Sequence, residues 1–416
     1  MKRKHFLTII LSFSLVLTVV TGAFATGYAA GSRGSPTDPL GEVLSGVLPG
    51  IVPTTPPVGE DQKWKLFVEV WEVVSQNFYR PVDKDVMVRA AIRGMLETLE
   101  DPHTVLLDPS VSQRAREQTR QKFQGIGARI EEKDGQIIIH SVFPDSPAQS
   151  GGLQPGDIIM AVDGDPIAGE TPEETALRIR GAAGTDVVLT VKRGEEEPFD
   201  LTLTRAEIRI PSLSAQTLEG NVGYIRLWSF GALTADDLRA ALESLVDAEA
   251  PGVILDLRDN PGGLLGAAIR VSGEFLPRRT VVLYEEQAQQ LRPYRVPREG
   301  VALDIPLVVL VNERSASASE IVAGALAHYD RAVIIGQRTF GKGTVQLPHD
   351  LSDGSQLRVT ISRWLTPGKE SISEVGITPS IVVEADFDGT KPLEEDAAVQ
   401  RALQELARVA SLSNAA

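Results

Sequence analysis

One segment of the chain places three serines where nucleophilic chemistry could occur. The run VLVNERSASASEIVAGAL (309–326) predicts a strand, a turn and a helix, with Ser315, Ser317 and Ser319 at the bend. A serine at the start of a helix is usually only a cap, and that interpretation suits two of the three. A nucleophilic serine would benefit from the same place, because helix amides and the positive dipole end stabilise developing negative charge. The backbone N–H of the next residue, Ala318, could help to stabilise this charge.

A glycine pair is the second feature with chemical potential. VILDLRDNPGGLL (253–265) predicts a buried strand, a Pro-Gly-Gly turn and the start of a helix. Adjacent glycines such as Gly262 and Gly263 allow backbone amides to point at one spot, which is how an oxyanion is held. The alternative is a plain turn between strand and helix.

Lys342 lies in a segment that superficially resembles a phosphate-binding loop. In GQRTFGKGT (336–344), Gly336, Gly341 and Lys342 fit the beginning of G-x-x-x-x-G-K-[ST]. However, Gly343 stands where Ser or Thr is required. The residues that follow, TVQLPHDL and SQLRVTISRW, alternate like hairpin strands and lack the helix of a nucleotide-binding loop. The pattern therefore disfavours an NTPase.

A lysine between glycines, together with a serine at a helix start, instead suits a Ser-Lys dyad. An unperturbed lysine has a pKa of ~10.4, so its amine is almost wholly protonated at neutral pH. Burial against apolar walls lowers that pKa and makes the amine a usable base. Gln346, four residues on, is uncharged and could orient the amine without stabilising its protonated form. The alternative for Lys342 is a surface lysine in a hairpin.

Composition excludes several other classes of chemistry. The chain has no cysteine, which excludes thiol nucleophiles, thiolate metal sites and disulfides. A formal net charge of -15 argues against nucleic acid as the main partner. None of the five histidines (His5, His103, His140, His328 and His349) sits in a comparable glycine-rich loop, so a His-based triad has no support. We expect no metal and no cofactor.

The N-terminus predicts export. A basic start, MKRKH, precedes an apolar run within residues 1–30, which suits either a secretory signal with an A-x-A-like site at Ala23–Ala25 or a membrane anchor. Residues 31–60 are rich in Gly, Pro, Ser and Thr and indicate a linker. Because basic flanks stay inside, we expect an extracytoplasmic protein of the cell envelope, membrane-anchored or secreted.

The remaining chain divides into regions of different texture. Helical spacing predicts a helical pair over 61–100, within an N-terminal helical domain at 61–118, whose large apolar residues form either a core or a homodimer surface. Short strands and turns fill 119–195, with one helix that begins at a capping box at Thr171–Glu174. Residues 196–392 alternate strands and helices, with near-continuous apolar strands expected to be buried on both faces. A closing helix and tail occupy 393–416.

The chemical segments together resemble the carboxyl-terminal processing peptidases, or tail-specific serine proteases. DLRDNPGGLL, NERSASASEIVAGAL and GQRTFGKGTVQ occur in the order and wording of that family. QGIGARI (124–130) and SPAQSGGLQPGDIIMAVDG (146–164) resemble the PDZ domain of these enzymes, and GITPSIVV (376–383) resembles their closing strand. The implied fold is a multidomain α+β chain, with an N-terminal helical segment, a β-barrel-like PDZ domain and a crotonase-like α/β protease core.

The resemblance also implies roles for particular residues. Ser317 would be the nucleophile, Lys342 the general base and Gln346 its orienter. Ala318 and Gly263 would form the oxyanion hole, with Gly262 as the alternative glycine. The implied substrates are proteins or peptides with exposed C-termini, bound at a loop that follows Gln124 and consists of Gly125, Ile126, Gly127 and Ala128.

Two alternatives of other classes stay open at this point. One is a membrane-tethered PDZ scaffold with an inactive hydrolase core, which intact Ser317 and Lys342 disfavour. The other is an acyl-CoA enzyme, because a crotonase-like core alone does not specify its chemistry. A Ser-Lys pair has no evident place in the second.

Overall fold

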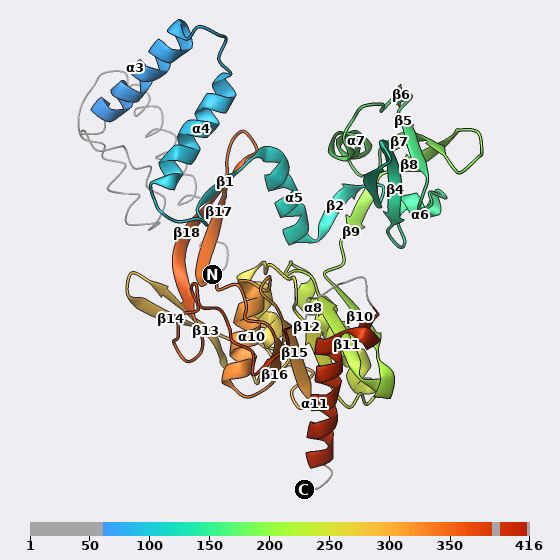
Figure 1. The fold of residues 1–416 in the computed structure, drawn as a ribbon, viewed down its shortest axis with the longest axis vertical. Coiled ribbons are helices and arrows are strands. Elements are labelled where there is room, and N and C mark those ends of the chain that lie inside the picture. The colour runs from blue at the N-terminus through green and yellow to red at the C-terminus, as the bar shows by residue number, and fades with distance from the viewer. Residues whose placement is uncertain (1–60, 385–391, 414–416) are drawn as a thin grey trace, which may run out of the picture. The chain divides into compact units, whose positions relative to one another are not determined.

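The computed structural model describes residues 61–384 and 392–413, shown in Figure 1. The expected leader (1–30) and linker (31–60) lie outside the described residues. The chain divides into two compact units, residues 1–87 and 88–416. Among the helices of the described residues, none combines the length and apolarity that crossing a membrane requires.

Two helices form the expected helical pair. Helix α3 spans Asp61–Asn77 and α4 spans Lys84–Glu97. Helix α3 exposes a row of large apolar side chains, of which Trp64 is 57% and Val70 54% exposed, with Phe67 beside them. In α3 the apolar residues are therefore surface and not core of this unit.

A six-stranded sheet with two short helices forms the region expected to be a PDZ domain. The strands are β3 (Ala128–Lys133), β4 (Gln136–Val142), β5 (Ile158–Val162), β6 (Asp165–Pro166), β7 (Asp186–Lys192) and β8 (Phe199–Thr204). Their order is β3-β4-β5-β7-β8, with β6 beside β5, so β3 is an edge strand. The helices are α6 (Pro147–Ser150) and α7 (Pro172–Ile179). The predicted capping box is confirmed, since Thr171 and Glu174 bond reciprocally at the start of α7.

Helix α5 and strand β2 precede the PDZ sheet in the chain, and strand β9, which pairs with β2, follows it. Helix α5 spans Pro109–Arg120, and β2 (Lys122–Gly125) pairs antiparallel with β9 (Ala206–Arg209). Between α5 and β2, the Gln121 side chain is buried and its Oε1 accepts the Leu233 amide at 2.6 Å. Strand β2 thus leads the chain from α5 into the PDZ sheet, and β9 leads it out toward β10 (Figure 1).

The region expected to be the protease core is built on a second six-stranded sheet. Its strands are β10 (Leu213–Thr217), β11 (Gly223–Leu227), β12 (Val253–Asp256), β15 (Leu307–Val311), β16 (Val333–Gly336) and β19 (Ile381–Val382), in that order. All neighbours after the β10–β11 pair are parallel. Every residue of β12 and β15 is buried, which confirms the prediction from their continuous apolar sequences.

Helices cover both faces of this sheet. Leu255 faces one cluster with α8 (Thr234–Asp247), α9 (Leu265–Ser272) and α10 (Ala318–His328). Its neighbour Ile254 faces the opposite cluster with α11 (Ala397–Ser413), the expected closing helix. Alternate strand residues therefore serve two separate cores. A threonine ahead of ADDLRAALESLV is typical of a helix cap, but Thr234 is the first residue of α8 and Leu233 precedes it at the cap position.

A third sheet flanks the core. Its strands are β1 (Val105–Leu107), β13 (Val281–Gln287), β14 (Gln290–Arg295), β17 (Thr344–Asp350) and β18 (Gln356–Leu365). Strands β17 and β18 form an antiparallel hairpin, which confirms that a strand and not a helix follows Lys342. Strand β1 pairs with the same β18.

A buried ionic cluster fastens α11 to the sheet. The Arg258 guanidinium bonds the Asp256 carboxylate at the end of β12 and also Asp396, just before α11. The Arg258 side chain is only 4% exposed and that of Asp256 is fully buried. The Tyr224 hydroxyl donates to Asp256 at 2.7 Å. These partners compensate a charge that would otherwise be costly to bury.

Replacing Arg258 should therefore destabilise the core strongly. In Arg258→Met, Asp256 stays buried with neutral donors only, and we expect a loss of about 3–5 kcal/mol in the free energy of unfolding. Urea denaturation followed by fluorescence measures this. The matched control is Arg401→Met, which breaks a partly exposed pair with Glu405 on α11 and should cost less than about 1 kcal/mol. An equal loss in the free energy of unfolding for the two substitutions would contradict the role given to the buried cluster around Arg258.

Candidate active site

The Ser317 turn joins the end of β15 to the start of α10. Ser317 has φ 55° and ψ -112°, a conformation that non-glycine residues rarely adopt and that is found at functional sites. The hydroxyls of Ser315 and Ser319 are buried and donate to the carbonyls of Leu257 and Asn260, at 2.7 and 2.9 Å. These two serines are structural, although they bind the neighbouring loop and do not cap the helix. Only the Ser317 hydroxyl remains without such a bond.

The glycine pair packs directly against this turn. A Cβ placed on Gly262 would lie 2.8 Å from the Ala318 nitrogen, and Gly262 has φ +97°. The Gly262 amide donates to the Asn260 side chain at 2.9 Å. Among the hydrogen bonds of the described residues, none uses the amide of Gly263 or of Ala318 as donor. The amides of Gly263 and Ala318, the two predicted oxyanion donors, are thus free, and Gly262, the neighbour of Gly263, packs against Ala318.

Lys342 lies in the loop between β16 and β17 and is partly buried. The Trp364 indole donates to its carbonyl at 3.0 Å and fixes the backbone. Burial lowers the pKa of the Lys342 amine below its ordinary value, and the Arg358 guanidinium lowers it further. The Asp101 and Glu320 carboxylates act in the opposite direction and raise it. The surface-lysine alternative does not fit a partly buried amine.

One cleft of about 460 Å³ brings the predicted catalytic residues together. Ser317, Gly262, Gly263, Lys342 and Gln346 all line it, although they come from three separate segments. The Gln346 amide nitrogen donates to the hydroxyls of Thr344 and Thr360, which leaves its oxygen for another donor. In the described part of the chain, no hydrogen bond joins the Lys342 amine to the Ser317 hydroxyl. None of the four described histidines lines the cleft.

The predicted tail-binding residues line a different groove, of about 530 Å³. Gly125, Ile126, Gly127 and Ala128 border it between the edge strand β3 and helix α7. The carbonyls of Ile126 and Gly127 accept the amides of Ala148 and Phe143, both at 2.8 Å. Their own amides are not donors in any hydrogen bond of the described residues, so they are available to a ligand.

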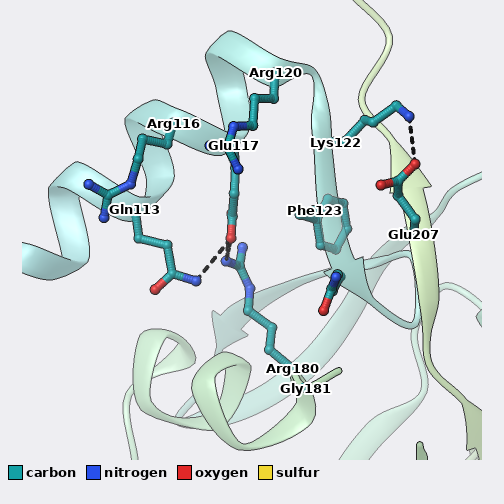
Figure 2. Close-up of a pocket in the computed structure, with 10 residues that line it drawn as sticks. Gln113, Arg116, Glu117, Arg120, Lys122, Phe123, Arg180, Gly181 and Glu207 are labelled. Atoms are coloured by element: carbon teal, nitrogen blue, oxygen red, sulfur yellow. Dashed lines mark hydrogen bonds and ion pairs between the residues drawn. The ribbon is translucent and has the colours of Figure 1, made fainter. Parts of the chain in front are cut away.

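A smaller pocket lies beside α5, shown in Figure 2. Arg180, at the end of α7, extends to the Glu117 carboxylate of α5 and lies 5.3 Å from the centre of the Phe123 ring. Arg116 and Arg120 of α5 border both this pocket and the cleft that holds Ser317. Helix α5 therefore connects the surroundings of the two sites.

Two residues that influence Lys342 were not predicted from the sequence, namely Glu320 and Arg358. Glu320 follows Ser317 by three residues, and the spacing S-x-x-E is a readable capping-box signal. Arg358 acts on Lys342 from β18, and no local pattern marks it, because the contact depends on the register of distant strands.

The fold and the cleft define a serine peptidase core joined to a PDZ domain, and comparisons with known proteins agree. The family model "Peptidase family S41" matches residues 221–383, "PDZ domain" matches 124–203 and "Activating protease CtpB N-terminal domain" matches 53–111. The chain is 36% identical over 324 residues to the Carboxy-terminal processing protease CtpA of Bacillus subtilis (strain 168). This alignment covers 78% of the chain and 70% of that relative. The chain belongs to the carboxy-terminal processing proteases of peptidase family S41.

Two further similarities complete the comparison. The Carboxy-terminal processing protease CtpB of the same organism is 34% identical, over 78% of this chain and 69% of its own length. A solved structure of a photosystem II D1 C-terminal processing protease is 30% identical and matches with a TM-score of 0.44, covering 78% of this chain and 87% of the other. The predicted family is confirmed, the chain is a peptidase, and the inactive-scaffold alternative is not favoured.

The glycine pair gives a direct prediction. A Cβ on Gly263, where φ is +149°, would lie 2.2 Å from the Phe230 carbonyl oxygen, so Gly263→Ala must displace the loop. We expect proteolysis to fall by about 10²–10³-fold, as when one oxyanion donor is lost, while peptide binding to the PDZ domain stays unchanged.

Cleavage rates and peptide affinity measured on the same samples check this. Gly266→Ala is the matched control, because a Cβ there meets nothing within 4 Å and the residue lies in helix α9. Near-normal cleavage by Gly263→Ala would contradict the expected role of this loop.

Proposed function

We propose that this protease is a serine endopeptidase that uses a Ser317–Lys342 dyad to cleave proteins near their C-termini. The observation that carries the proposal is one cleft lined by Ser317 in a rarely adopted backbone conformation, by the partly buried Lys342 and by Gly263, whose amide is free. The lowered pKa of Lys342 supports a neutral amine as base.

The proposed reaction follows from these positions. Lys342 accepts the proton of the Ser317 hydroxyl as the oxygen attacks a peptide carbonyl. The amides of Ala318 and Gly263 donate to the resulting oxyanion, a contribution of ~3 kcal/mol per donor. The leaving amine takes the proton from Lys342, and water then hydrolyses the acyl-enzyme. The free oxygen of Gln346 orients the amine. We expect the Ser317 hydroxyl and the Lys342 amine to approach each other when substrate binds. Catalytic hydrogen bonds are often long in the free enzyme and shorten only in the complex with substrate.

We propose that the PDZ groove reads the substrate tail. An extended peptide adds beside β3, and the free amides at Ile126 and Gly127 bind its terminal carboxylate. Helix α5 borders both the active cleft and the pocket beside the PDZ region, which supports gating of the cleft by the bound tail. Deleting the PDZ domain should abolish selectivity for tails, and unchanged selectivity and basal rate would argue against both statements.

We also propose that the protein works outside the cytoplasm, anchored or secreted through its basic and apolar leader (1–30). Fractionation of cells, with protease accessibility from outside, tests this.

The exposed apolar face of α3 supports pairing with a second copy of the chain, because such faces mark interaction sites. Phe67→Glu should then convert a sedimenting dimer into a monomer, and an unchanged sedimentation coefficient would contradict it.

The dyad is tested by comparing wild type, Ser317→Ala and Lys342→Ala on an unfolded protein with an apolar C-terminal tail. We expect Ser317→Ala to be inactive and Lys342→Ala to lose at least about 10²–10⁴-fold, the usual contribution of a general base. Tail binding should survive in both. Full cleavage by Lys342→Ala would remove the lysine from the mechanism.

Arg358 provides a prediction about pH. Its guanidinium disfavours the protonated form of Lys342, so removing it raises the pKa of the lysine. Since the neutral amine is the proposed base, the acidic limb of the pH–rate profile should move to higher pH in Arg358→Gln. Profiles of kcat/KM measure this. Arg363→Gln, an exposed position on the same strand, is the control and should leave the limb in place. A shift to lower pH in Arg358→Gln would contradict the electrostatic account.

A further inference from the structure

Glu320 is a fully buried carboxylate within the active-site region that the proposed reaction does not use. It lies in the first turn of α10, three residues after Ser317. A buried charge requires donors, and those of Glu320 are four neutral groups. Within the described residues, no lysine or arginine forms an ion pair with it. The arrangement is therefore not a salt bridge.

The donors come from two segments that are separate in sequence. One carboxylate oxygen accepts the Ser317 amide at 2.8 Å and the Lys342 amide at 2.9 Å. The other accepts the Thr339 hydroxyl at 2.6 Å and the Gly341 amide at 2.7 Å. The backbone nitrogens of the proposed nucleophile and base are thus bound to the same oxygen atom and lie within two hydrogen-bond lengths of each other.

These bonds also explain how the Ser317 turn keeps its conformation. A residue in a sparsely populated region of φ and ψ costs about 1–3 kcal/mol and persists only when its surroundings determine it. The bond from its amide to Glu320 is one such restraint. The loop of Lys342 contains Gly341 at φ +92°, and its amide is held by the same carboxylate.

We infer that Glu320 is a positioning residue that holds the Ser317 turn and the Lys342 loop in catalytic register. The inference rests on the proposed dyad. Glu320 contacts neither substrate nor reacting atoms. Its charge is unfavourable for the base, since it raises the pKa of Lys342. Its value to the site is consequently geometric, because only a carboxylate offers two oxygens to four donors.

Glu320→Gln separates these two effects. Glutamine keeps the size of the side chain but turns one acceptor into an NH₂ group that faces two donors. We expect kcat to fall by about 10²-fold, the cost of a misplacement of ~1 Å, with KM and PDZ peptide affinity unchanged. Loss of the negative charge lowers the pKa of Lys342, so the acidic limb of the kcat profile should move to lower pH. The other groups that act on this amine, Arg358, Asp101 and His103, remain in place.

The experiment uses the full chain and two further variants. Glu320→Asp keeps both oxygens on a shorter arm and should retain more activity than Glu320→Gln, with the acidic limb near its original pH. Glu274→Gln is the matched control, because Glu274 is also fully buried but pairs with Arg239 and Arg298, far in sequence from the Ser317 turn and the Lys342 loop. Its pH limb should not move.

The possible results are distinct. A wild-type kcat and pH profile in Glu320→Gln, with Ser317→Ala and Lys342→Ala inactive, overturns the inference and leaves the dyad intact. The inference is also overturned if Glu320→Gln and Glu274→Gln lose the same amount of kcat and neither shifts the acidic limb of the pH–rate profile. That result would indicate general destabilisation of the core. If Glu320→Gln does not fold, Glu320→Asp decides, and full activity there overturns it. Cleavage retained by Ser317→Ala would instead refute the proposed function.

Discussion

The proposed mechanism depends on keeping the Lys342 amine partly out of water. A hydrated lysine is protonated at neutral pH and cannot take a proton from a serine. Here burial is the largest influence on the amine and acts in the required direction, and the Arg358 guanidinium adds to it. The nearby carboxylates of Asp101 and Glu320 act in the opposite direction, so the pKa of the Lys342 amine reflects a balance between desolvation and nearby charges. The surrounding structure has to provide that burial without closing the cleft.

The parallel sheet meets this requirement through its topology. Strands β12, β15 and β16 are parallel neighbours, so the loops that follow them emerge at one edge and carry the glycine pair, Ser317 and Lys342. The β17–β18 hairpin then supplies Gln346 and Arg358 beside the same loops. Two hydrophobic cores, one on each face of the sheet, hold these strands rigid. A site on rigid elements keeps its geometry better than one on free loops.

Much of this was predictable from sequence, because the decisive signals are local. The continuous apolar runs at 252–257 and 306–311 identified the buried strands, and the glycine and serine turns next to them identified the cleft residues. What could not be predicted depends on distant partners. Thr234 looks like a cap by its neighbours, but Gln121, far away in sequence, occupies the helix start. Arg358 acts through strand register, and Glu320 reads as an ordinary capping glutamate until the Lys342 loop is seen to share it.

The most direct test is an NMR titration of the Lys342 amine. Protein labelled with ¹³C at lysine, carrying Ser317→Ala to prevent self-cleavage, would be titrated, with the Lys342 signal assigned by its absence in Lys342→Arg. We predict that this amine has a lower pKa than an ordinary exposed lysine, because burial and Arg358 disfavour its charged form. A titration midpoint at or above that of an ordinary exposed lysine, in the folded protein, would contradict a neutral-lysine mechanism.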